Sequence, residues 1–155
     1  MYKYLTILSL LILSFDKLNA QDAENPIQWK VSIEKTEKSN EYLLNATGLI
    51  AEGYHIWHLD AGGDGSLINT EIEMDDPHGY VWKEESWKTE QKPIPVNLDY
   101  IDGTLFWHEK QIDIKRTLIS DNSMPIEGKV IFQVCNEQYC YPPEEHIFKL
   151  NIPID

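Results

Sequence analysis

The sequence predicts an all-β chain, folded as one immunoglobulin-like antiparallel β-sandwich. Short segments alternate apolar and polar residues, as from Trp29 to Ile33, which is the period of a strand with one buried face. Polar turn residues such as Lys38, Ser39 and Asn40 separate these segments, and apolar residues at helical spacing are hard to find. Seven or eight short strands divided by such turns are typical of a β-sandwich.

A second strand follows the first, with Tyr42, Leu44 and Ala46 as its apolar residues. Further strands are expected at residues 53–59, 67–74, 80–83, 104–117, 129–135 and 146–152. Two longer loops lie between them, at residues 60–65 and 92–103. Loops of this length on a rigid sandwich often carry function, so both are candidate site elements.

The first twenty residues are expected to be a secretory signal peptide, and residues 21–155 a single mature domain. Lys3 provides a basic start, an apolar stretch runs from Leu5 to Phe15, and Ala20 is the small residue before the expected cleavage point. A membrane-spanning helix needs roughly 20 apolar residues, and this stretch is shorter. We therefore expect a protein of the periplasm or a secreted protein, with no membrane anchor after cleavage.

The mature chain is acidic. Removal of residues 1–20 leaves 135 residues with 11 basic and 25 acidic side chains, a net charge near −14. Such a surface repels phosphate backbones, so nucleic acid is excluded as an expected partner. A domain of this size buries enough core to fold without a covalent link, and a disulfide across a small loop restricts the unfolded chain little. A contribution to stability is thus a weak explanation for the presence of Cys135 and Cys140, the two cysteines of the sequence.

Both cysteines lie in the segment VCNEQYCYPP, with a polar stretch of four residues between them. An alternating apolar run ends at Cys135, so this residue is expected at the end of a strand, and the stretch up to Cys140 has the length of a hairpin loop. Pro142 and Pro143 lack N–H donors, so the returning segment must lie at an edge or on the surface. The pair is therefore expected near the surface at one end of the sandwich, close enough to form a disulfide.

From the residues alone, three interpretations of the pair stay open. The first is a structural disulfide in a secreted binding module, and the second is a redox-active disulfide, although C-x4-C is not the C-x-x-C of thioredoxins. The third is a copper-delivery site, because Cu(I) favours soft sulfur ligands and a histidine from another strand could join them. The spacing expected of a zinc site is absent from the sequence.

The segment from Val134 to Pro143 resembles the active-site segment of the N-terminal periplasmic domain of the thiol:disulfide interchange protein DsbD. In that family a strand ends in Cys, a short polar loop follows, and a second Cys leads into Pro-Pro. The likeness covers nearly the whole mature chain. GYHIW at residues 53–57 resembles the family's Gly-aromatic-x-aliphatic-aromatic strand, and NLDYIDG at residues 97–103 takes the place of its acidic, aromatic cap loop.

The resemblance implies an immunoglobulin-like carrier that passes reducing equivalents between thioredoxin-like partners outside the cytoplasm. It implies that Cys140 forms mixed disulfides with partners and that Cys135 resolves them. The residues expected to shield the pair as a cap are Asp99, Tyr100, Ile101 and Asp102. The residues expected near the site are His55, Trp57, Tyr139 and Tyr141.

The sequence also departs from the family. The loop between the cysteines is one residue shorter than in the best-known members, and the transmembrane segment and C-terminal thioredoxin-like domain of full-length members are missing from this sequence. We therefore expect the electron donor to be a separate protein, either thioredoxin-like or a membrane-bound thiol reductase acting in trans. Candidate clients are a disulfide isomerase and the cytochrome c maturation apparatus, and no cofactor or metal is expected in this reaction.

Overall fold

The computed structural model describes residues 25–75, 79–122 and 124–153, which form twelve β-strands. These are β1 (Ile27–Lys35), β2 (Glu41–Ile50), β3 (Tyr54–Gly62), β4 (Glu71–Met74), β5 (Tyr80–Trp82), β6 (Lys88–Thr89), β7 (Ile94–Val96), β8 (Leu105–His108), β9 (Gln111–Ser120), β10 (Ile126–Phe132), β11 (Val134–Asn136) and β12 (Glu144–Leu150). Within the described ranges no segment is helical, and hence none is a helix that could cross a membrane. The expected signal peptide, residues 1–20, lies outside them.

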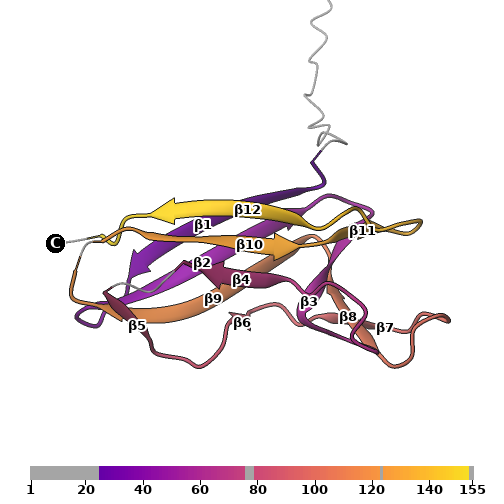
Figure 1. Cartoon of the computed structure of the whole chain (residues 1–155), viewed down its shortest axis with the longest axis horizontal. Helices are drawn as coiled ribbons and strands as arrows, with labels where there is room; N and C mark the ends of the chain where they lie inside the picture. Colours follow the sequence, from indigo (N-terminus) through magenta and orange to yellow (C-terminus); the bar gives the residue numbers. More distant parts are fainter. Residues whose placement is uncertain (1–24, 76–78, 123, 154–155) are drawn as a thin grey trace, which may run out of the picture.

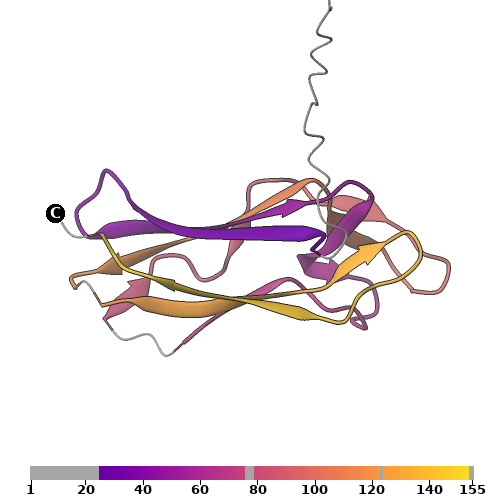
Figure 2. The ribbon, with the colours of Figure 1, turned by 90° about the horizontal axis from the view of Figure 1, so that it is seen from above.

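Two antiparallel sheets form the body of the sandwich (Figures 1 and 2). The five-stranded sheet has the order β1-β2-β9-β5, with β6 also paired to β9, and the three-stranded sheet has the order β12-β10-β4. Their inner faces share one core, in which Leu44 of β2, Ile114 of β9, Val130 of β10 and Phe148 of β12 are buried. The predicted immunoglobulin-like sandwich is confirmed, because alternate residues of the long strands, such as β2 and β10, enter the core between the sheets.

A third, four-stranded sheet lies at one end of the sandwich, at the right of Figure 1, and we call it the end sheet. Its order is β11-β3-β8-β7. Two of its strands are connected to body strands by only one or two residues. The chain leaves β10 at Phe132 and enters β11 at Val134, so Cys135 belongs to the end sheet. Similarly, β8 ends at His108 and β9 begins at Gln111, after a turn in which Lys110 has a φ of 65°.

These changes of sheet correct the predicted strand boundaries. Residues 104–117 and residues 129–135 were each expected to form one strand, and each is divided between two strands of different sheets. The strand expected at residues 67–74 is shorter, because β4 begins only at Glu71. Before it, side chains replace the strand pairing: Asn69 Oδ1 accepts a hydrogen bond from an N–H of β3 at 2.9 Å, and Thr70 Oγ1 donates to a β3 carbonyl at 2.5 Å.

The two loops predicted as site elements lie against each other at the end sheet, and the second of them is not wholly a loop, because its residues Ile94–Val96 form β7. The N–H of Gly63 donates to the carbonyl of Thr104 at 3.2 Å. Gly63 has a φ of 66°, and a Cβ there would lie 2.4 Å from Cδ2 of Leu105, so only glycine fits this approach. The first loop, which begins within the end of β3, therefore supports the base of the segment at residues 97–103.

A buried carboxylate fixes the other end of this second loop. Asp113 of β9 is only 8% exposed, and its carboxylate accepts hydrogen bonds from Thr47 Oγ1 at 2.6 Å, Gln111 Nε2 at 2.6 Å and Gln91 Nε2. Its own N–H donates to Gln91 Oε1 at 2.8 Å. Burial acts to raise the pKa of Asp113, but the three donated hydrogen bonds outweigh it, and the pKa lies below its ordinary value.

Replacing Asp113 by Asn is expected to lower the free energy of unfolding by about 1–3 kcal/mol, because an amide cannot accept all three donors. Urea unfolding at neutral pH measures the loss. Glu34→Gln is the matched control, since Glu34 is exposed and a surface substitution should change stability by less than roughly 0.5 kcal/mol. Equal stabilities of the two variants would show that the Asp113 network contributes nothing.

Candidate active site

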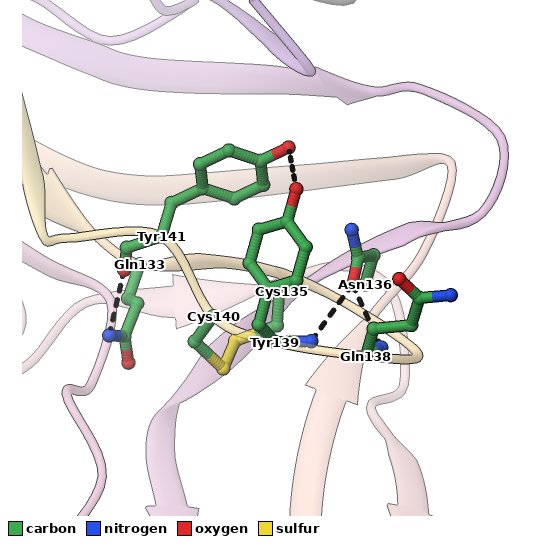
Figure 3. Close-up of a disulfide and its surroundings, with 7 residues drawn as sticks. All are labelled: Gln133, Cys135, Asn136, Gln138, Tyr139, Cys140 and Tyr141. Atoms are coloured by element: carbon green, nitrogen blue, oxygen red, sulfur yellow. Dashed lines mark hydrogen bonds between the residues drawn. A yellow bond between two sulfur atoms is a disulfide. The ribbon is translucent and has the colours of Figure 1, made fainter.

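The two cysteines form a disulfide across a tight hairpin at the end of β11 (Figure 3). Their Cα atoms are 3.9 Å apart, and the two residues form an isolated antiparallel bridge. Asn136 closes the loop: its N–H donates to the carbonyl of Tyr139 at 2.9 Å, and its Oδ1 accepts from the N–H groups of Gln138 and Tyr139. An Asn side chain that satisfies two backbone donors fixes the turn, so the disulfide sits on a defined backbone.

The two sulfur-bearing residues differ in access to solvent. Cys135 is buried, with 1% of its surface exposed, whereas Cys140 is exposed. Val134 continues the buried alternation of β10, whereas Cys135 lies on the other face of β11 and is buried in a second cluster with Trp57 and Leu105. Cys140 begins the returning segment. That segment stays at the surface, as the Pro142-Pro143 pair predicts. An incoming thiolate can therefore reach Cys140 more readily than Cys135.

The disulfide lines a pocket of about 280 Å³, which we call the cysteine pocket. Its walls come from β3, β8, the segment at residues 97–103 and the hairpin between the cysteines. The lining residues are His55, Trp57, Leu98, Tyr100, Trp107, Cys135, Asn136, Glu137, Gln138, Tyr139 and Cys140. Aromatic and apolar side chains make up most of the walls, and the hairpin adds a few polar groups, a composition typical of ligand-binding pockets.

Strand pairing explains why the aromatic rings meet the disulfide. Cys135 of β11 lies directly opposite His55 of β3, and Trp57 of β3 lies opposite Trp107 of β8. Opposite residues of an antiparallel pair point to the same face of the sheet. The His55 ring stacks on Trp107 with centroids 4.0 Å apart, and it meets Trp57 edge-on at 5.4 Å.

A model of the N-terminal domain of the thiol:disulfide interchange protein DsbD matches residues 24–152 of the chain. The chain belongs to this family. The match covers most of the sequence, including the whole of the cysteine pocket and both body sheets. It confirms the resemblance found in the sequence and associates the chain with thiol:disulfide exchange.

Solved structures show that the fold is that of DsbD N-terminal domains. The Neisseria meningitidis DsbD N-terminal domain in the reduced form matches with a TM-score of 0.59 and 15% identity, over 86% of this chain and 93% of that chain. The complex between the DsbD and PilB N-terminal domains of the same organism matches with a TM-score of 0.56 and 13% identity, over 86% of this chain and 87% of that chain. Among curated protein sequences, none matches the chain.

The N-terminal periplasmic domain of ScsB from Proteus mirabilis also matches, with a TM-score of 0.60 and 15% identity. The alignment covers 83% of this chain but only 48% of the ScsB domain, so the chain spans about half of that structure. At these identities the likeness to ScsB and to the DsbD N-terminal domains shows the fold alone.

The four residues predicted as a cap in this DsbD-family chain take different positions. Tyr100 lines the cysteine pocket although 80% of its surface is exposed. Ile101 instead packs against the buried cluster that contains Leu105, and its N–H donates to the carbonyl of Leu98 at 3.2 Å. Asp99 and Asp102 are exposed and do not line the pocket; Leu98 and Tyr100 are the residues of this segment that line it.

The residues predicted near the site are mostly brought to it. His55, Trp57 and Tyr139 line the cysteine pocket, whereas Tyr141 lies beside it. The hydroxyl oxygens of Tyr139 and Tyr141 are 3.1 Å apart (Figure 3), and the hydrogen bond with Tyr139 is the main cause of a raised pKa of Tyr141. The Tyr141 ring is also near Tyr54, at a centroid distance of 6.2 Å.

Outside the hairpin between the cysteines, two pocket residues were missed by the sequence interpretation. Trp107 was placed within a long strand without a role, and Leu98 precedes the four residues proposed as the cap. The alternation of Leu105 and Trp107 was a usable signal for a shared face, but only the pairing with β3 places Trp107 beside the cysteines. Among the described residues, no group of three His, Cys, Asp or Glu side chains is arranged to hold a metal ion.

A histidine pair, of which one ring is buried and the other partly buried, lies behind the cysteine pocket. His108 of β8 is 2% exposed, and its Nε2 lies 2.9 Å from Nδ1 of His58 of β3. One of the two nitrogens must accept the hydrogen bond. Burial, and secondly the neighbouring His58, lower the pKa of His108 from its ordinary 6.5 to about 4.

The stability of the fold should therefore fall as the pH drops from about 6.5 to about 4. The unfolded chain binds a proton at His108 in this range and the folded chain does not, so acid favours unfolding by up to roughly 3 kcal/mol. Urea unfolding at several pH values measures the slope. His108→Gln should be less stable at pH 7 but show a shallower slope than the wild type, and His146→Gln on β12 is the control. A wild-type slope in His108→Gln would contradict this assignment.

Proposed function

We propose that this chain is a thiol:disulfide exchange carrier, which passes reducing equivalents between thioredoxin-like partners through Cys135 and Cys140. The observation that carries the proposal is the asymmetry of the disulfide, with an exposed Cys140 joined to a buried Cys135 in an open aromatic pocket. A purely structural bridge needs no such access. Membership of the DsbD N-terminal family supports the same chemistry.

Reduction of the carrier takes two exchange steps. A thiolate of the donor attacks Sγ of Cys140, the bond to Cys135 breaks, and Cys135 leaves as a thiolate that takes up a proton. The second donor thiol then attacks the donor sulfur in the mixed disulfide, which releases Cys140 and an oxidised donor. The reduced carrier repeats the sequence in the opposite sense on an oxidised client, so two electrons and two protons pass in each cycle.

The cap proposal rests on the position of Leu98 and Tyr100 at the mouth of the cysteine pocket. In the free protein these side chains would restrict the approach of small oxidants to Cys140 without burying it, and a docking partner would displace Tyr100, which is the more exposed of the two. Glu137 adds a negative charge beside the disulfide, which disfavours thiolate formation in the free reduced protein.

The proposed partners are thioredoxin-like proteins and, as donor, a membrane-bound thiol reductase supplied in trans. The DsbD N-terminal domain of Neisseria meningitidis forms a complex with the PilB N-terminal domain, which supports a partner protein docking on a domain of this fold. The proposed location is the periplasm or the extracellular space, on the basis of the signal peptide expected at residues 1–20.

Electron transfer to a thioredoxin-like domain tests this function. The reduced chain, without residues 1–20, is mixed with an oxidised thioredoxin-like domain, and free thiols on each protein are counted by mass after acid quenching and alkylation. We expect thiols to disappear from Cys135 and Cys140 as they appear on the partner. The proposal fails if a small dithiol exchanges with the pair but thioredoxin-like domains of either redox state do not.

A further inference from the structure

His55 occupies a position that the exchange mechanism above does not use. It lies directly opposite Cys135 in the pairing of β3 with β11, and both residues line the cysteine pocket. Cβ atoms of opposite residues in an antiparallel pair are about 4.5–5.5 Å apart on the same face of the sheet. His55 is also the one basic side chain among the residues that line this pocket, so its imidazole is the base that the pocket offers to the buried thiol of reduced Cys135.

The ring of His55 is held in place while its nitrogens stay available. Stacking on Trp107 and the edge contact with Trp57 restrict the ring from two sides. No hydrogen bond joins either ring nitrogen to another residue of the described chain, in contrast to His58 and His108, which bond to each other. An imidazole that is fixed by packing and not engaged by the protein can exchange a proton with a group in the pocket.

The charge state of His55 suits a proton acceptor. Burial lowers the pKa of His55, and the negative charge of Glu109 opposes this effect. The imidazole is thus neutral at neutral pH, and Glu109, whose carboxylate is held by Trp107 Nε1 at 3.1 Å, stabilises the cation once a proton arrives. The other titratable groups around the pocket are Cys135, Cys140, Glu137 and Tyr139 of the hairpin and Tyr100 of the cap segment.

We propose that His55 accepts the proton of the Cys135 thiol when Cys135 resolves a mixed disulfide on Cys140. This inference deepens the proposed exchange function and rests on it for its biological meaning. Cys140 is exposed and can lose its proton to water, whereas Cys135 is buried and depends on a base inside the pocket. Burial in an apolar site also makes a thiol harder to ionise, so a base has a larger effect on Cys135 than on the exposed Cys140.

The step balances in atoms and charge. The Cys135 S–H proton moves to a ring nitrogen of His55, and the Cys135 thiolate attacks Sγ of Cys140. The bond between Cys135 and Cys140 forms, and the bond between Cys140 and the client sulfur breaks. The client leaves as a thiolate, which takes the proton from the imidazolium, so the client sulfur is reduced and Cys135 is oxidised.

Stopped-flow reaction with an aromatic disulfide, such as Ellman's reagent, separates the two cysteines. The reduced protein should release one coloured thiolate as Cys140 attacks and a second as Cys135 resolves the mixed disulfide. We expect His55→Gln to slow the second phase about 10- to 100-fold at pH 7 and to leave the first phase within about twofold. The difference should shrink toward pH 9, where the thiol ionises without a base.

Two further variants separate a proton-acceptor role of His55 from a role in packing alone. His55→Phe retains an aromatic ring for stacking and should slow the second phase in the same pH-dependent way. His58→Gln changes a histidine of the same strand that does not line the cysteine pocket, and it should leave the second phase unchanged. An equal slowing of His55→Gln at every pH, or none at all, would contradict the proton-acceptor role.

The proton-acceptor role of His55 and the carrier function can fail independently of each other. A wild-type protein that shows a His55-dependent second phase but never exchanges with thioredoxin-like domains would overturn the carrier function and uphold this inference. Exchange with such domains at rates that do not depend on His55 or on pH would uphold the carrier function and overturn the proton-acceptor role of His55.

Discussion

Replacing Cys135 by Ser is expected to trap a mixed disulfide on Cys140 when the protein meets glutathione disulfide. The exposed thiol still attacks, but no second thiol is left to resolve the product. Intact mass after acid quenching should show nearly complete glutathionylation. In the parallel variant Cys140→Ser the remaining thiol is the buried Cys135, and its reaction should be slower by about 100-fold, because it must wait for local opening of the pocket.

These paired variants have the largest expected effect because they exchange an exposed sulfur for a buried one. The matched control is unfolding in urea, where both variants should react at similar rates once the pocket is lost. Equal rates for the two folded variants would contradict the assignment of Cys140 as the attacking sulfur. Faster reaction of Cys140→Ser would reverse the roles of the two cysteines.

Removing the two side chains at the mouth of the cysteine pocket is expected to expose the disulfide. The double variant Leu98→Ala with Tyr100→Ala should be reduced by a small monothiol about tenfold faster than the wild type, because the approach to Cys140 is no longer screened. The rate is measured by quenching and counting free thiols by mass. A thermal melt checks that the sandwich remains folded.

Asp99→Ala is the matched control for the cap, since it lies in the same segment but does not line the pocket. Its reduction rate should stay within about twofold of the wild type. An unchanged rate in the double variant would mean that Leu98 and Tyr100 do not shield the pair. Faster reduction of both the double variant and Asp99→Ala would point to a loosened loop in place of lost side-chain cover.

The sequence predicted those parts of the molecule that depend on local pattern. Period-two alternation indicated the strands of the sandwich core, and the run of Val130, Phe132 and Val134 indicated that Cys135 lies at a strand end. The Pro142-Pro143 pair, which cannot donate to a sheet, correctly indicated a returning segment at the surface. In each case the information lies within a few neighbouring residues.

The pocket could not be predicted in the same way because it depends on changes of sheet. Gln133 breaks the run from β10 and turns Cys135 toward β3, and alternation alone does not show this break. Cys135 and Trp107 both meet His55 because β11 and β8 lie on either side of β3. The choice between Tyr100 and Ile101 as the cap residue also needs the three-dimensional structure. Ile101 packs against the buried cluster, and its neighbour Tyr100 lines the pocket.

The reduction potential of the Cys135–Cys140 pair tests the central claim most directly. The protein is equilibrated in graded dithiol buffers, and free thiols are counted by mass after alkylation. A working carrier should have a potential between roughly −180 and −270 mV, the range in which thiol carriers exchange electrons with one another. A potential below roughly −300 mV would mark a structural bridge and contradict the carrier function.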